Sequence, residues 1–218
     1  MKVIAFNGSP RKKNWNTVTL LKYFLKGVES VGAKTELIHL YDLNYSGCVS
    51  CFACKRKDRK NDGVCALKDD LSSVLERVKK TDVFAIGSPV YYGAESAATR
   101  ALLERLCFPY NKYSKDKKSL FPKKIKTALI YTMNVREDAI KALGYDQHFN
   151  ITKMSLEKTF GNCEILFATD TLQYSDYDKY EHEMFNKEDK IKRHKTVFPH
   201  DCEVAFNLGK RLSEKNIG

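Results

Sequence analysis

The strongest constraint on the fold is a set of five short apolar segments, separated along the chain by helical patterns and polar loops. Most of them are apolar in a continuous run, which is typical of parallel strands buried on both faces of a sheet. The expected strands are Lys2–Phe6, Lys34–Leu40, Asp82–Ile86, Lys126–Thr132 and Cys163–Ala168.

Apolar residues at helical spacing lie between these strands and after the last of them. The expected helices are Thr17–Val31, Asp69–Lys80, Ala94–Leu106 and Asp201–Leu212. Strands that alternate with helices predict an α/β fold with helices on both faces of a parallel sheet. Five strands fit the doubly wound, flavodoxin-like topology with strand order 2-1-3-4-5.

A chain of 218 residues is long enough for one well-packed domain, so we expect residues 1–218 to form a single unit. Two stretches exceed the minimal plan, at about 108–124 and 170–200, and both are rich in charge and tyrosine. We expect them to contribute to a subunit interface or a lid. No apolar run is long enough for a membrane span or a signal peptide, so a cytoplasmic protein is expected.

The net charge of +11 favours anionic partners, and nucleic acid is one alternative. The basic residues, however, are spread over Lys55–Lys60, Lys112–Lys126 and Lys187–Lys195 without a recognition motif. We therefore expect phosphorylated small molecules, and neither nucleic acid nor a membrane, as partners.

The loop after the first strand, Asn7–Thr17, has neither the glycine-rich pattern of nucleoside triphosphatases nor that of dinucleotide folds. It offers hydroxyls from Ser9 and Thr17, the Asn16 amide, Arg11 and the N–H groups that begin a helix. Such donors suit a phosphate monoester. The alternative is that Asn16 or Thr17 only caps the helix.

The loop after the third strand, Gly87–Gly93, also lies at a carboxyl end of the expected sheet. Its backbone amides can bind the polar edge of a flat heterocycle, while Tyr91 and Tyr92 offer ring faces. The alternative is a simple turn whose tyrosines pack in an interface. Because a phosphate loop is expected one strand away, we favour the interpretation of Gly87–Gly93 as part of a ligand site over that of a simple turn.

Four motifs, GSPRKKNWNT, SPVYYG, YTMNV and DTLQ, resemble those of the flavodoxin-like NADPH-dependent FMN reductases. The similarity runs from Met1 to about Leu212, and the branch related to iron–sulfur flavoproteins is the nearest. The resemblance implies FMN, with its phosphate held by Ser9, Arg11, Asn16 and Thr17. It also implies an isoalloxazine ring between two groups of residues, namely Pro89, Val90, Tyr91, Tyr92 and Gly93 on one side and Thr132, Met133 and Asn134 on the other.

One part of the phosphate loop departs from the family pattern S-P-R-x-x-G-N-T. Lys12–Trp15 is one residue longer and lacks the glycine, so the conformation between the phosphate contacts is not fixed by the resemblance. Trp15 packs either over the cofactor or on the surface.

The resemblance implies an FMN-dependent oxidoreductase that takes hydride from NAD(P)H and passes electrons to a quinone, flavin, iron or protein acceptor. Because the cofactor carries this chemistry, no catalytic residue is named. The alternative is an electron carrier or redox-sensing module with little NAD(P)H turnover. A homodimer or homotetramer is expected, and neither the acceptor nor the choice between NADH and NADPH follows from the sequence.

Four of the seven cysteines, Cys48, Cys51, Cys54 and Cys65, lie within nineteen residues. Such a set can hold a 4Fe–4S cluster or zinc. The last spacing is longer than in the compact motif of the related iron–sulfur flavoproteins, and the insert is hydrophilic. We therefore expect reduced thiols near the flavin or at an interface, with a 4Fe–4S cluster or zinc as the less favoured alternatives. Cys107, Cys163 and Cys202 are expected to be packing residues.

Overall fold

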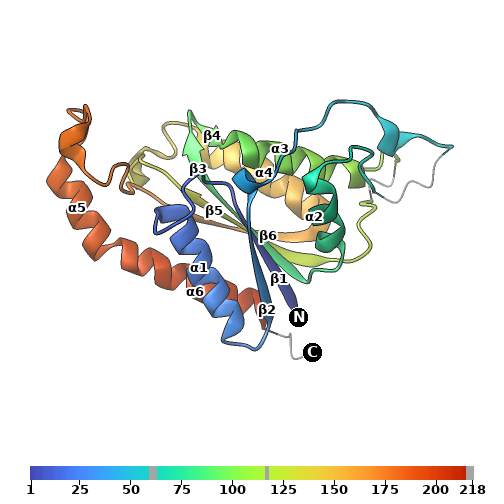
Figure 1. Cartoon of the computed structure of the whole chain (residues 1–218), viewed down its shortest axis with the longest axis horizontal. Helices are drawn as coiled ribbons and strands as arrows, with labels where there is room; N and C mark the ends of the chain where they lie inside the picture. The colour runs from blue at the N-terminus through green and yellow to red at the C-terminus, as the bar shows by residue number, and fades with distance from the viewer. Residues whose placement is uncertain (59–62, 116–117, 215–218) are drawn as a thin grey trace.

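In the computed structural model, which describes residues 1–58, 63–115 and 118–214, five parallel strands form a sheet with helices on both faces (Figure 1). A sixth strand, β4 (Ala94–Glu95), pairs antiparallel with the end of β3. The parallel strands lie in the order β2-β1-β3-β5-β6, which is the expected order once β4 is left aside. Their bounds are β1 Lys2–Asn7, β2 Lys34–His39, β3 Val83–Tyr91, β5 Ile125–Thr132 and β6 Gly161–Ala168.

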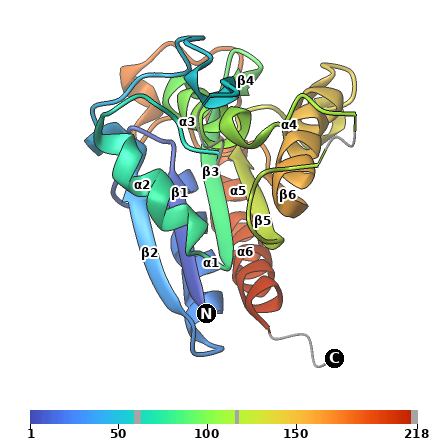
Figure 2. The same ribbon diagram turned by 90° about the vertical axis from the view of Figure 1, so that its right-hand side faces the viewer.

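Alternate side chains of each central strand enter different cores. In β1, Val3 and Ala5 pack with α1 (Asn16–Glu29) and α6 (Phe198–Ser213). Ile4 and Phe6 belong to the opposite cluster, with α2 (Asp70–Lys79), α3 (Ala97–Cys107) and α4 (Tyr145–Phe160). This two-sided burial explains the continuous apolar runs in the sequence. The two helical layers, one on each face of the sheet, are visible in Figures 1 and 2. The same figures show that α5 leads into α6. The helices are α1 Asn16–Glu29, α2 Asp70–Lys79, α3 Ala97–Cys107, α4 Tyr145–Phe160, α5 Lys187–Thr196 and α6 Phe198–Ser213.

Some element boundaries differ from those expected. Strand β3 continues to Tyr91 because it pairs with β5 through Pro89 and then with β4. Helix α3 begins at Ala97 instead of Ala94, because the Ser96 side chain accepts a hydrogen bond from Thr99 N and caps the helix there. The sequence prediction also omitted α4 and α5, whose exposed faces weaken the apolar pattern.

The two expected excursions bury more of their aromatic residues within the chain itself than predicted. Tyr110 and Phe121 are buried in the larger core cluster, and Tyr177 is also buried, so these rings are not available to a partner. Tyr113 and Tyr180 remain exposed. Residues 116–117 of the first excursion and 215–218 of the expected domain lie outside the described residues. Within the described chain, no helix is both long and apolar enough to cross a membrane.

Candidate functional site

The carboxyl ends of β1, β3, β5 and β6 meet around a cavity of about 190 Å³. In an open parallel sheet, this edge is where ligands bind. The cavity brings together segments that are far apart in the sequence. It is lined by Ser9, Arg11, Trp15, Asn16, Thr17, Pro89, Val90, Tyr91, Thr132, Met133, Asn134, Thr171, Leu172, Gln173 and Tyr174.

The loop after β1 is shaped by Asn7, a fully buried residue that the sequence prediction had not placed in the site. Its Oδ1 accepts from Ser9 N at 3.1 Å, and its Nδ2 donates to Ser9 O at 3.2 Å. Gly8 N donates to Gly87 O, which joins this loop to β3. A Cβ at Gly8 would lie 1.8 Å from Thr99 Oγ1, so only glycine fits this close approach.

The first turn of α1 provides donors that suit an anion. Trp15 is the N-cap, yet no side chain of the described residues caps the helix, and the turn contains no acidic residue. Its N–H groups therefore have no carboxylate or hydroxyl competing for them. The Asn16 side chain is committed elsewhere, because its Nδ2 donates to Leu172 O at 2.8 Å. This donor set fits a phosphate monoester.

Arg11 connects the phosphate loop to the segment after β6. Its guanidinium lies 4.1 Å above the Trp15 ring, and its Nη1 donates to Gln173 O at 2.9 Å. Trp15 thus lines the cavity and supports Arg11 instead of lying alone on the surface. A cation stacked on an aromatic ring and held by one carbonyl still has donors left for a ligand.

A tight hairpin forms the rim of the cavity between β3 and β4. Tyr91 pairs with Ala94, and the two residues between them, Tyr92 and Gly93, both have positive φ, at 48° and 81°. This is the backbone pattern of a type I′ turn, in which glycine is favoured and tyrosine is strained. The Tyr91 ring lines the cavity, whereas Tyr92 is fully exposed at the tip.

Glu95, next to this hairpin, is a buried carboxylate that ties β4 to β5 and α4. Its Oε1 accepts from Tyr131 Oη and Thr152 Oγ1, both at 2.8 Å, and His148 Nε2 lies 3.5 Å from Oε2. Burial acts to raise the pKa of Glu95, but these hydrogen bonds and His148 outweigh it and hold the pKa below its ordinary value. The hairpin therefore rests on a charged, hydrogen-bonded support.

The opposite wall combines the residues after β5 with those after β6. Asn134 Nδ2 donates to Gln173 Oε1 at 3.1 Å, and Thr171 N and Oγ1 both donate to Met133 O. Gln173 N in turn donates to Tyr177 Oη at 3.1 Å. These bonds fix two loops into one surface that faces the cavity.

The cysteine segment lies away from this cavity. Cys48, Cys51, Cys54 and Cys65 line a separate void of about 10 Å³, which is at the lower limit for a single water. Burial, with help from the Cys65 and Cys51 thiols, raises the pKa of Cys54, while Lys55 opposes this rise. Among the described residues, no three or more histidine, cysteine or carboxylate side chains are arranged to hold a metal ion.

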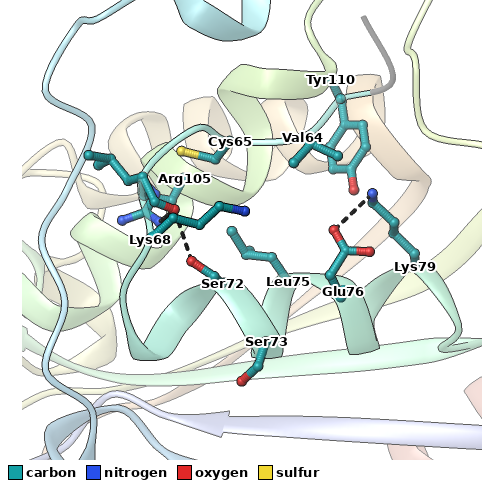
Figure 3. Close-up of a pocket in the computed structure, with 12 residues that line it drawn as sticks. Val64, Cys65, Lys68, Ser72, Ser73, Leu75, Glu76, Lys79, Arg105 and Tyr110 are labelled. Carbon is teal, nitrogen blue, oxygen red and sulfur yellow. Dashed lines mark hydrogen bonds and ion pairs between the residues drawn. The ribbon is translucent and has the colours of Figure 1, made fainter. Parts of the chain in front are cut away.

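Cys65 also lines a neighbouring cavity of about 200 Å³ between α2, α3 and the end of the cysteine segment (Figure 3). Beside it, the buried Arg105 binds Asp69 through both guanidinium ends, at 2.7 and 3.1 Å, and donates to Ser46 O. Arg105 thus anchors both ends of the cysteine segment to α3. Residues 59–62, within the polar insert between Cys54 and Cys65, lie outside the described residues.

The cavity at the sheet edge is lined by most of the residues that were predicted to bind the cofactor. Tyr92 and Gly93 are the exceptions, because they form the hairpin tip. The prediction did not include Asn7, Thr171, Leu172, Gln173 or Tyr174 among the site residues. The available signals were their positions at the end of β1 and after β6, at the carboxyl edge of a parallel sheet, and the DTLQ motif of Asp170–Gln173.

The sequence model of a family described as "NADPH-dependent FMN reductase" matches residues 1–148. An iron-sulfur flavoprotein of Archaeoglobus fulgidus is 37% identical over 105 residues, which are 48% of this chain and 48% of that protein. An iron-sulfur flavoprotein of Methanocaldococcus jannaschii is also 37% identical over 105 residues, covering 48% of this chain and 51% of its own length. The chain thus spans about half the length of these curated relatives.

Solved structures show the same fold over nearly the whole chain. An NAD(P)H:quinone oxidoreductase from Methanothermobacter marburgensis superposes with a TM-score of 0.73 at 16% identity, covering 99% of this chain and 98% of that one. An FMN-dependent NADH-azoreductase from Bacillus anthracis, in complex with FMN, gives 0.68 at 13% identity, covering 98% and 100%. At such identities the likeness establishes the fold alone.

Proposed function

Because this chain belongs to the NADPH-dependent FMN reductase family, we propose that it binds FMN in the cavity at the sheet edge and uses it to move electrons from NAD(P)H to an acceptor. The observation that carries the proposal is the convergence of an uncapped helix start, Arg11 and the hairpin residue Tyr91 on one cavity. FMN supplies the hydride and electron transfer chemistry when it is bound.

The phosphate would be held by the loop after β1. Ser9, Arg11, Asn16 and Thr17 all line the cavity, beside the first turn of α1. That turn offers N–H groups and the positive end of the helix dipole to an anion. Arg11 adds a charge-assisted contact.

The isoalloxazine ring would lie in the cavity in contact with both of its walls, with one face left open. Pro89, Val90 and Tyr91 form one wall, with Tyr92 and Gly93 at its rim, and Thr132, Met133 and Asn134 belong to the other. These residues orient the ring and exclude water from one of its faces. The other face remains for the nicotinamide and for the acceptor, whose class we propose to be a quinone, flavin, iron centre or protein.

The test is a visible spectrum of the purified protein, followed by FMN titration of the apoprotein. We expect a flavin spectrum, one FMN per chain, and NAD(P)H oxidation with a quinone or dye acceptor. Arg11→Ala combined with Thr17→Ala should raise the FMN dissociation constant at least tenfold, while Lys13→Ala, which removes a charge from the same loop, should change it little. Wild-type affinity in the double variant would refute the phosphate assignment.

A second candidate is an electron carrier or redox sensor with bound FMN and little NAD(P)H turnover. Two observations favour it, namely the curated relatives called iron-sulfur flavoproteins and the four cysteines that face one void. Flavin that is reduced by dithionite but not by NADH or NADPH would support this candidate. Rapid reduction by either nicotinamide would exclude it.

A further inference from the structure

Lys190, in α5, places a buried ammonium group behind the candidate flavin site. Only 5% of its side chain is exposed, although α5 belongs to the charged 170–200 excursion. Its Nζ donates to Asn134 O at 3.2 Å, to Asn134 Oδ1 and to Asp170 Oδ1. An ammonium has three donors, so these acceptors satisfy it completely.

The two residues that Lys190 contacts carry the loops of one cavity wall. Asn134 follows β5, and Asp170 begins the segment that continues through Thr171 to Tyr174. Asp170 has a φ of 50°, a left-handed conformation that is strained for a residue with a side chain. The Lys190–Asp170 pair, together with the bond from Asp170 N to Val135 O at 2.8 Å, holds it there.

The same ammonium fixes the direction of a pair of side-chain amides. Because Asn134 Oδ1 accepts from Lys190, its Nδ2 is the end that donates to Gln173 Oε1. Gln173 Oε1 is thereby occupied, and Gln173 Nε2 has no hydrogen-bond partner among the residues described. Gln173 lines the cavity, so its remaining amide donor is the group available to a ligand there.

We propose that Lys190 is a positioning residue for the cofactor: it orients the Asn134–Gln173 amide pair so that Gln173 presents a donor to a carbonyl oxygen of the flavin ring. This inference rests on the proposed function. A methionine at this position would keep the packing but would leave Asn134 free to reverse, which would turn Gln173 Oε1 toward the ligand. A carbonyl that meets an acceptor instead of a donor binds less well.

The experiment compares Lys190→Met and Lys190→Arg with wild type in two measurements. The first is FMN titration of the apoprotein, in which we expect at least a tenfold rise in the dissociation constant for Lys190→Met and substantial rescue by arginine. The second is amide hydrogen exchange of the apoprotein, in which the Asp170 and Thr171 amides should exchange faster in Lys190→Met. Lys187→Met is the matched control, because this lysine of the same helix makes only an exposed pair with Asp178.

The double variant Lys190→Met/Asp170→Asn removes both charges and guards against misfolding caused by an unpaired carboxylate. This double variant should fold, and its affinity for FMN should remain below that of wild type, since the amide pair has lost its orienting cation. Wild-type affinity and wild-type exchange in Lys190→Met would overturn the inference. Failure of the wild-type protein to bind FMN would refute the proposed function instead, and the exchange measurement would still show whether Lys190 holds the loop.

Discussion

The side-chain oxygens of Thr17 and Thr132 lie 2.7 Å apart, which joins the start of α1 to the end of β5 beneath the candidate site. Both residues are buried, and each hydroxyl has the other as its side-chain partner. The bond therefore fixes the spacing between the phosphate loop and the wall that carries Met133 and Asn134.

We predict that Thr132→Val lowers the free energy of unfolding of the apoprotein by about 1–2 kcal/mol, because it leaves the Thr17 hydroxyl buried without its partner. Thr132→Ser keeps the hydroxyl and should recover most of the loss. Urea denaturation followed by circular dichroism measures both. Equal stability of the valine variant and wild type would show that the bond contributes nothing.

The depressed pKa of Glu95 predicts a loss of stability in acid. Because its pKa is lower in the folded than in the unfolded protein, its stabilising contribution is complete above the ordinary value of 4.5 and is lost as the pH falls through the folded value. Glu95→Gln should lower the free energy of unfolding by about 1–3 kcal/mol at pH 7. The difference in unfolding free energy between this variant and wild type should become smaller as the pH falls toward 3. Urea denaturation across this range checks it, and a difference that does not change with pH would contradict it.

The cysteine segment is predicted to contain reduced thiols in the working protein. After anaerobic purification, we expect no stoichiometric iron or sulfide. We also expect seven thiols per chain to react with a thiol reagent after unfolding, including those of Cys48, Cys51, Cys54 and Cys65. The physical reason is the polar spacing of ten residues between Cys54 and Cys65, because ligation would have to offset the cost of ordering this insert. About four irons per chain, lost in Cys51→Ser/Cys54→Ser, would contradict this prediction.

A homodimer or homotetramer remains a prediction, and the exposed apolar residues suggest which surface to test. Phe52, Tyr113 and Ile151 are 51%, 71% and 66% exposed and line one groove between the cysteine segment, α3 and α4. We expect a dimer or tetramer mass in light scattering at micromolar concentration, and a monomer for Ile151→Glu. Lys153→Glu, which changes a neighbouring position of α4, is the control. A monomeric wild type would exclude the oligomer.

The sequence by itself determined the layered fold and most of the candidate site. Continuous apolar runs such as Val3–Phe6 require burial on both faces, and this burial predicts parallel strands between two helical layers. The carboxyl ends of such strands must then meet at one edge. The loops at Ser9–Thr17 and Pro89–Gly93 could therefore be assigned to a common site before any contact was known.

Only the tertiary structure decided how this site is supported. Lys190 appears in the sequence as one lysine in a charged stretch, and Glu95 appears as a polar residue at the start of the expected helix Ala94–Leu106. Their burial depends on partners that are distant in the sequence. Lys190 binds Asn134, which is more than fifty residues away, and Glu95 binds Tyr131, which is more than thirty residues away. Local periodicity reports which side of an element is apolar, whereas long-range pairing of buried polar groups leaves no local pattern, and so it becomes visible only when the chain has folded.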